Sequence, residues 1–170
     1  QGNTVDMSVW KEKIKRLPMV TEVLDNYYHP MISKVMMSSQ IAQWEGNEHR
    51  LEHPIPMTTF LATEEFFKFY DITLLAGEWL HGLSTKEDII INESLAQKLG
   101  WSAEEAIGKH FRGYSGSIEY KIIGVVKDCH YGPPTSKMLN VAFIADDMTG
   151  MCFWNTCVFF KYKEGTWAQC

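Results

Sequence analysis

The chain has 170 residues, of which 45% are hydrophobic and 22% are charged, and its formal net charge is −5 at neutral pH. This composition is typical of a globular domain with a substantial core and excludes a disordered tail. Lysine and arginine are interspersed with acids, which argues against nucleic-acid binding, because that requires a basic surface. No apolar run reaches the roughly 18–20 residues of a membrane-spanning helix, and no signal-peptide pattern opens the sequence.

The first quarter of the chain predicts one helix followed by two strands. Apolar residues recur at helical spacing from Asp6 to Leu17, and Pro18 ends this predicted helix. Strands are predicted over residues 19–28 and 35–45, where β-branched, aromatic and other apolar residues alternate with polar ones.

A third strand is predicted over residues 55–63. It should pair antiparallel with the preceding strand, because the connection is too short for a parallel crossover. Pro54 and Pro56 should place its beginning at a sheet edge. Thr63 is then expected to cap a short helix, and residues 71–76 to form a strand.

The densest structural signals lie between residues 88 and 131. Asp88–Ile91 contains three consecutive isoleucines, which predict a strand buried on both faces of a sheet. Asn92 is expected to end this strand and to accept an N-cap hydrogen bond from the helix that follows, and Gly100 to close that helix. The S-x-x-E spacing that begins at Ser102 predicts a capping box.

Three further strands are predicted beyond this helical segment. The first covers residues 120–126 after a glycine-rich loop, and it leaves the core at Asp128. The others cover residues 138–145 and 151–162. The last has apolar residues on both faces, so it is expected inside a sheet.

Several of these segments resemble one protein family. The sequences IINESLAQKLGW, EEAIGK and YKIIGVVKDCHYG are similar to the MacB-like periplasmic core domain, found in permease subunits of MacB- and FtsX-type ABC transporters. The matching positions are Asn92, Glu93, Ala96, Leu99, Gly100, Ile107, Gly108, Ile122, Gly124, Val125, Val126 and Asp128. Upstream, EEFFKFYDITLLAGEWL resembles the family's helix, strand and glycine turn. Glu78 stands where the family commonly has a basic residue, which puts in doubt any ion pair made there.

The resemblance implies an α+β fold with mixed and antiparallel sheets, a few short helices and two lobes. We expect these lobes, within one extracytoplasmic domain, at residues 1–76 with 135–170 and at residues 77–134. It also implies that the chain is a fragment, with one membrane helix before Gln1 and about three after Cys170.

In function, the resemblance implies a non-enzymatic module at the periplasmic face of the bacterial inner membrane. It would transmit motion, driven by ATP hydrolysis in a separate cytoplasmic subunit, to a substrate, adaptor or partner in the periplasm. The family also implies a homodimer in the full transporter. No Walker loop is present, and no catalytic residue, cofactor, metal site or nucleic-acid partner is predicted. The sequence does not identify substrate-binding residues.

A metal-dependent hydrolase of the periplasm is the main alternative. His49, Glu52 and His53 match the H-x-x-E-H pattern of inverted zinc proteases. Because Pro54 and Pro56 follow within one turn, a solvated hairpin connection is favoured over a helical zinc site. A ligand-binding sensor domain is a further alternative, which only the flanking sequences would distinguish from a transporter domain.

Other chemically notable residues have structural interpretations that we favour. Asp128 is interpreted as a turn cap and not as a general base, because no nucleophile lies near it in sequence. Isolated histidines give weak support to a metal site or pH sensor, and these are His29, His81, His110 and His130. Several methionine and aromatic residues are expected to pack in the core, in preference to forming an exposed apolar surface for a substrate or partner. They are Met31, Met36, Met37, Met57, Tyr27, Tyr28 and Trp44.

The four cysteines form no C-x-x-C pair, and they are Cys129, Cys152, Cys157 and Cys170. On one extended strand, Cys152 and Cys157 would lie roughly 16 Å apart, too far to bridge each other. Buried thiols are favoured, and a different pairing stays open.

Overall fold

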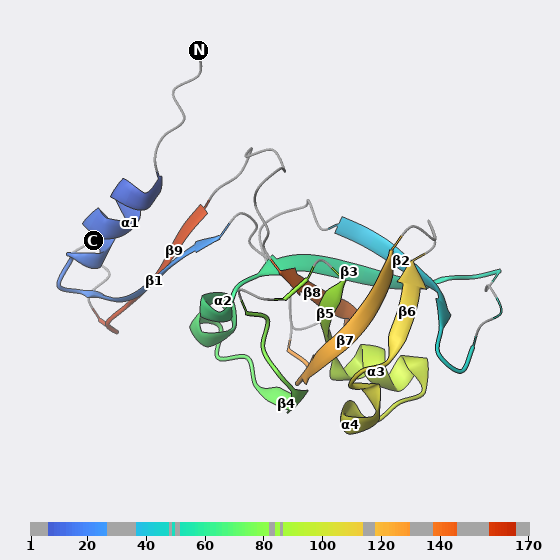
Figure 1. Cartoon of the computed structure of the whole chain (residues 1–170). Coiled ribbons are helices and arrows are strands. Elements are labelled where there is room, and N and C mark those ends of the chain that lie inside the picture. Colours follow the sequence, from blue (N-terminus) through green and yellow to red (C-terminus); the bar gives the residue numbers. More distant parts are fainter. Residues whose placement is uncertain are drawn as a thin grey trace, which may run out of the picture. The chain divides into compact units, whose positions relative to one another are not determined.

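The chain folds into two units that each contain their own β-sheet (Figure 1). One unit comprises Gln1–His29 with Met151–Cys170, and the other comprises Pro30–Gly150. The computed structural model describes residues 7–26, 37–47, 49, 52–81, 84–85, 87–113, 118–129, 138–145 and 157–165.

The smaller unit consists of helix α1 (Met7–Lys15) and the antiparallel strands β1 (Val20–Asn26) and β9 (Cys157–Tyr162). The predicted first helix and first strand are thereby confirmed. The expectation that the last strand lies inside a sheet is wrong, because in the described part of the chain β9 pairs with β1 alone. Its two faces also differ: Phe159 lies opposite the buried Leu24, whereas Phe160, on the other face, is 37% exposed.

The described part of the larger unit contains seven strands and three short helices. Its elements are β2 (Met37–Trp44), β3 (Ile55–Ala62), α2 (Glu64–Phe69), β4 (Leu74–Gly77), β5 (Asp88–Asn92), α3 (Glu93–Leu99), α4 (Ala103–Ala106), β6 (His110–Gly113), β7 (Glu119–Val126) and β8 (Val141–Ala145). The predicted α+β class with mixed pairing is confirmed. The predicted lobes (residues 1–76 with 135–170, and 77–134) need correction, because β3 and β5 come from different predicted lobes and share one sheet.

The large sheet closes on itself. Its strand order is β4-β7-β5-β8-β3-β2-β6, and β6 pairs in addition with the first half of β7. Six strands therefore form a hydrogen-bonded ring, while β4 pairs with the second half of β7. Closure gives each of these six strands two neighbours, and among the described strands of the sheet it leaves β4 as the edge.

The predicted antiparallel pairing of β2 with β3 is confirmed. Strand β3 lies between β2 and β8, but it pairs with β8 only from Thr58 onward. Pro56 therefore has a strand neighbour on one side, as the proline pattern predicted for the beginning of this strand.

Strand β5 lies at the centre of the sheet, between β7 and β8, and its three isoleucines are fully buried as predicted. Ile89 and Ile91 belong to the core that α3 covers through Leu95 and Leu99. Ile90 pairs instead with Phe143.

An aromatic cluster fills the face of the sheet on which Phe143 lies. Phe143 contacts Phe66 and Phe67 of α2, with ring centroids 5.9 and 5.1 Å apart. It also lies 5.9 Å from Phe60 of the neighbouring strand β3. The same central strands are thus buried on both faces, which explains their continuous apolar sequence.

Local signals position the helices. The Thr63 hydroxyl accepts a hydrogen bond from the Phe66 amide, so the predicted N-cap of α2 is confirmed. Ser102 and Glu105 form the predicted capping box at α4. Gly100 closes α3 with a φ of 91°, a backbone conformation that favours glycine.

Asn92 differs from its prediction, because its side chain does not cap α3. Its amide group donates to Asp128 Oδ1 (2.6 Å) and to the Leu139 carbonyl (2.9 Å), and its oxygen accepts from the Val141 amide (2.8 Å). The helix cap comes from Asp128 instead, which accepts hydrogen bonds from the backbone amide and the hydroxyl of Ser94. The negative charge of the Asp128 carboxylate interacts favourably with the N-terminus of α3. The neutral Asn92 side chain instead joins the end of β5 to the segments at the ends of its neighbours β7 and β8.

Substitution of Asn92 by alanine should destabilise the fold by roughly 3 kcal/mol, because the buried Val141 amide of β8 loses its partner and the partly buried Leu139 carbonyl and Asp128 carboxylate each lose a hydrogen bond. Asn140 offers a matched control. Its side chain donates to the Pro56 carbonyl (2.8 Å) at an exposed position, so Asn140→Ala should cost less than about 1 kcal/mol. Urea denaturation of both variants measures the difference, and equal losses would contradict this account of Asn92.

Gly124 in β7 should not tolerate a side chain. A Cβ there would lie 2.5 Å from the Glu78 carbonyl oxygen, so Gly124→Ala should destabilise the protein by about 1–3 kcal/mol. Gly113 in β6 is a matched control, since its Cβ would meet nothing closer than 3.6 Å. Gly113→Ala should be neutral or slightly stabilising in thermal unfolding. A similar loss in both variants would show that strand flexibility, and not the close approach, matters.

Candidate functional site

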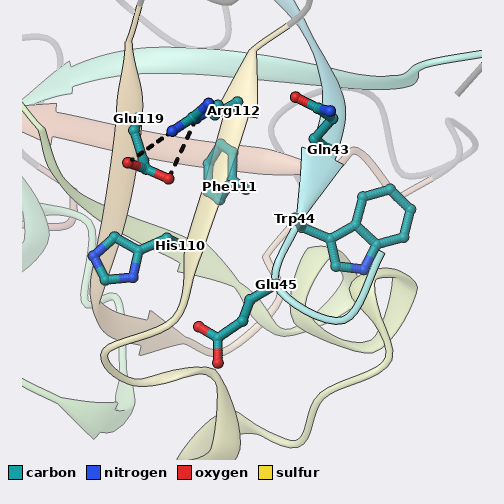
Figure 2. A pocket seen from close by; sticks show the side chains of 7 residues that line it. All are labelled: Gln43, Trp44, Glu45, His110, Phe111, Arg112 and Glu119. Atoms are coloured by element: carbon teal, nitrogen blue, oxygen red, sulfur yellow. Dashed lines mark hydrogen bonds and ion pairs between the residues drawn. The ribbon is translucent and has the colours of Figure 1, made fainter. Parts of the chain in front are cut away.

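A pocket of about 440 Å³ opens on the ring where β2, β6 and β7 meet (Figure 2). Its lining residues are Gln43, Trp44, Glu45, His110, Phe111, Arg112 and Glu119.

Strand pairing brings these residues together from distant parts of the sequence. Trp44 of β2 lies opposite Phe111 of β6, and Arg112 of β6 lies opposite Glu119 of β7. Phe111 is buried and packs against Tyr120, with ring centroids 5.4 Å apart. Its neighbours His110 and Arg112 therefore point to the exposed face, as alternation along a strand requires.

Each carboxylate of the pocket has a basic partner. Arg112 pairs with Glu119 at 3.3 Å through two of its nitrogens. Lys109 donates a hydrogen bond to Glu45 at 2.5 Å, and this bond holds the pKa of Glu45 below its ordinary range. The Glu45 backbone amide also donates to the His110 carbonyl, which fixes the end of β2 beside β6.

The described lining offers groups that can contact a ligand. Its side chains supply an indole, an imidazole, an amide and the carboxylates and guanidinium of two compensated ion pairs. Throughout the described residues, no three His, Cys, Asp or Glu side chains lie close enough to share a metal ion.

The H-x-x-E-H segment has no helical form where it is described. His49, Glu52 and His53 lie in bends and are exposed, so the helical geometry of an inverted zinc protease is not formed at these positions. The structure brings none of them to the pocket.

The other histidines are spread over the fold. His110 lines the pocket, while His81 lines a separate hollow of about 280 Å³ with Glu64 and Glu65 of α2. His29 and His130 lie outside the described residues.

Asp128 performs a structural role in the junction around Asn92. Both its carboxylate oxygens accept hydrogen bonds, from Asn92 and Ser94. Asp128 therefore has a structural capping role, but the predicted turn cap is wrong, because the capped element is helix α3.

The cysteines and methionines are only partly described. Cys129 is a half-buried thiol, and Cys157 contributes its backbone to β9. Met57 is buried in the core, as predicted, and Trp44 packs against that core from the pocket rim. The remaining residues of these sets lie outside the described side chains, and they are Cys152, Cys170, Met31, Met36, Met37, Tyr27 and Tyr28.

Five lining residues were not singled out from the sequence, and they are Gln43, Glu45, Phe111, Arg112 and Glu119. The alternation around Phe111 is a strand signal that would have placed His110 and Arg112 on one exposed face. The partners on β2 and β7 follow only from the strand register, which no local pattern specifies.

The family of the chain is now clear. Residues 2–166 match the model of the MacB-like periplasmic core domain, so the chain belongs to that family. No curated protein sequence matches it. None of the described helices is long and apolar enough to span a membrane.

Solved structures share the fold at low sequence identity. A domain of a candidate permease from Porphyromonas gingivalis has a TM-score of 0.59 at 19% identity, with 91% of this chain and 67% of that chain covered. The extracellular domain of the noncanonic ABC-type transporter YknZ from Gram-positive bacteria gives 0.57 at 15%, with 93% and 73% covered. The periplasmic region of MacB from Actinobacillus actinomycetemcomitans gives 0.53 at 11%, with 91% and 64% covered. The chain thus spans about two thirds of the periplasmic region of MacB.

The Glu45–Lys109 pair makes a pH-dependent contribution to stability. Since the pKa of Glu45 is lowered in the folded protein, the contribution is present above the ordinary glutamate pKa of about 4.3 and is lost as the pH falls through the folded-state pKa. Lys109→Met should therefore show a smaller loss of stability than the wild type on acidification, measured by urea denaturation from neutral to acidic pH. Lys98→Met, at an exposed position of α3, should retain the wild-type pH dependence. Equal pH dependence of Lys109→Met and wild type would contradict the role of the pair.

Proposed function

We propose that this chain is the extracytoplasmic domain of an ABC transporter permease, and that it transmits motion to a substrate or partner outside the inner membrane. In this proposal, a separate cytoplasmic subunit hydrolyses ATP, membrane helices flank the chain, and the full permease forms a homodimer. The observation that carries the proposal is the family match over residues 2–166.

The topology of the smaller unit supports a mechanical role. Strands β1 and β9 are antiparallel, with Val20 opposite Tyr162 and Asn26 opposite Cys157. The Lys163 amide also donates to the Met19 carbonyl at 2.8 Å. The segment before β1 and the segment after β9 are therefore joined at the same end of one ribbon.

Residues 30–150 are inserted in sequence between the two strands of this ribbon. If flanking membrane helices move, both their connections act on the same end of the ribbon, and the inserted unit is attached through its other end. A two-stranded hydrogen-bonded ribbon resists being pulled apart along several bonds at once, so it is suited to carry such a displacement.

Location is the first test. The native full-length protein should be recovered as an integral membrane protein in which externally added protease cleaves within residues 1–170 in spheroplasts. Cleavage only after the inner membrane is lysed, or a native chain without membrane anchorage, would overturn the proposal.

Transmission is tested in the full-length permease reconstituted with its ATPase. Amide hydrogen exchange in residues 30–150 should differ between the ATP-bound and nucleotide-free states. Leu24→Ala, which loosens the ribbon core by about 2–4 kcal/mol, should reduce that difference while ATP hydrolysis continues. Glu22→Gln, which removes only the exposed pair with Lys161 (3.2 Å), is the matched control and should behave as wild type. An unchanged response in Leu24→Ala would argue against the ribbon as the transmitting element.

A further inference from the structure

Helix α1 exposes large apolar side chains to solvent. Val9 is 48% exposed, Trp10 is 50% exposed, and Leu17 in the turn that follows the helix is 43% exposed. Side chains of this size normally lie in the core, so their clustering on one short segment indicates a contact surface.

Two of these side chains share a helix face with a basic residue, and the third lies beside another basic residue in the turn. At about 100° per residue, Val9, Lys13 and Trp10 lie within about a third of the circumference of α1, and the turn that follows carries the exposed Arg16 and Leu17. The half-buried Ile14 lies beyond one edge of this arc. We refer to the five residues as the α1 exposed face.

The charge of the α1 exposed face is uniformly positive. The only acid of the helix, Glu12, lies beyond the other edge of the arc and pairs with Lys15 at 3.3 Å. The Lys13 ammonium lies 5.2 Å from the Trp10 ring centroid, in the geometry of a cation–π contact. The segment from Met7 to Leu17 contains four basic residues and one acid, although the whole chain has a net charge of −5.

We propose that the α1 exposed face binds the surface of a bilayer that contains anionic phospholipids. Exposed apolar side chains beside lysine and arginine are the pattern of helices that lie in the headgroup region, where the indole of tryptophan is also favoured. Headgroup phosphates complement Lys13 and Arg16, and shallow insertion buries Val9, Trp10 and Leu17. This inference rests on the proposed function, which places the chain beside the inner membrane.

A second copy of the chain fits this face less well. In a two-fold symmetric dimer the same patch meets itself, so Lys13 and Arg16 would lie near their own counterparts without an acid on the face. Like charges that approach in this way disfavour pairing, whereas an anionic bilayer neutralises both.

The test is flotation of the 170-residue chain with vesicles. It should bind vesicles of equal parts phosphatidylcholine and phosphatidylglycerol, and not vesicles of phosphatidylcholine alone. Lys13→Glu combined with Arg16→Glu should weaken binding at least about twentyfold, since each basic residue accounts for about a fivefold effect. Binding should also weaken as salt is raised.

Two controls keep a folding defect separate from a loss of binding. Lys98→Glu with Lys121→Glu makes the same change of charge at exposed positions of the larger unit, and should bind as wild type. Lys13→Arg with Arg16→Lys keeps the charge of the face and should bind as wild type. The tryptophan emission should shift to shorter wavelength on vesicle binding, and Trp10→Phe should remove this shift.

Equal vesicle binding by the two charge-reversal variants would overturn the proposal, as would absence of binding to the anionic vesicles. A change of oligomeric state in Lys13→Glu with Arg16→Glu, measured by light scattering and without loss of vesicle binding, would assign the face to a second copy instead. These outcomes are distinct from failure of the proposed function, which the spheroplast experiment tests independently of lipid binding by this chain.

Discussion

The side chain of Asn92 is the constraint on which the larger unit most depends. It is fully buried, and each of its polar atoms has a partner. Through these bonds the end of β5 is joined to Asp128, just beyond β7, and to Leu139 and Val141 at the start of β8. Because β7 and β8 are the two neighbours of β5, one side chain aligns the ends of three adjacent strands. A buried polar network of this kind favours a single register only when every member is satisfied, and here all of them are.

Closure of the sheet and insertion in sequence have a joint mechanical consequence. A closed ring of six strands, with a core on the α3 face and an aromatic cluster on the face of Phe143, deforms less readily than an open sheet because each of the six ring strands is paired on both sides. Force applied to such a unit is more readily taken up by its connections than by its interior. In sequence those connections lead to β1 and β9, so under the proposed function the short ribbon is the element that would carry the displacement.

Features decided by neighbouring residues could be predicted from the sequence, whereas features decided by distant pairings could not. The capping box at Ser102 depends on four consecutive residues, and the burial of Ile89–Ile91 follows from composition alone. Asp128, which accepts a hydrogen bond from Asn92, lies 36 residues away in sequence. Asparagine is also a good N-cap residue, so the local pattern predicted a helix cap in place of this long-range hydrogen bond. The pocket could not be predicted, because Gln43 and Arg112 meet only through the register of β2 with β6. The family resemblance gave the fold class but not the division into units.

The distribution of charge separates the two surfaces that this chain presents. At the pocket, Glu45 pairs with Lys109, which directly precedes β6, and Glu119 of β7 pairs with Arg112 of β6, so their fields cancel within a few ångströms. At α1, among the described residues, Glu12 pairs with Lys15 at the edge of the exposed face and no acid pairs with Lys13 or Arg16. A charge without an opposite charge beside it attracts a charged partner over about a Debye length. An ion pair has little net field and interacts mainly with groups in direct contact with it. In the proposal made above, attraction over this distance would come from the α1 exposed face, whereas the compensated pairs of the pocket act only at short range.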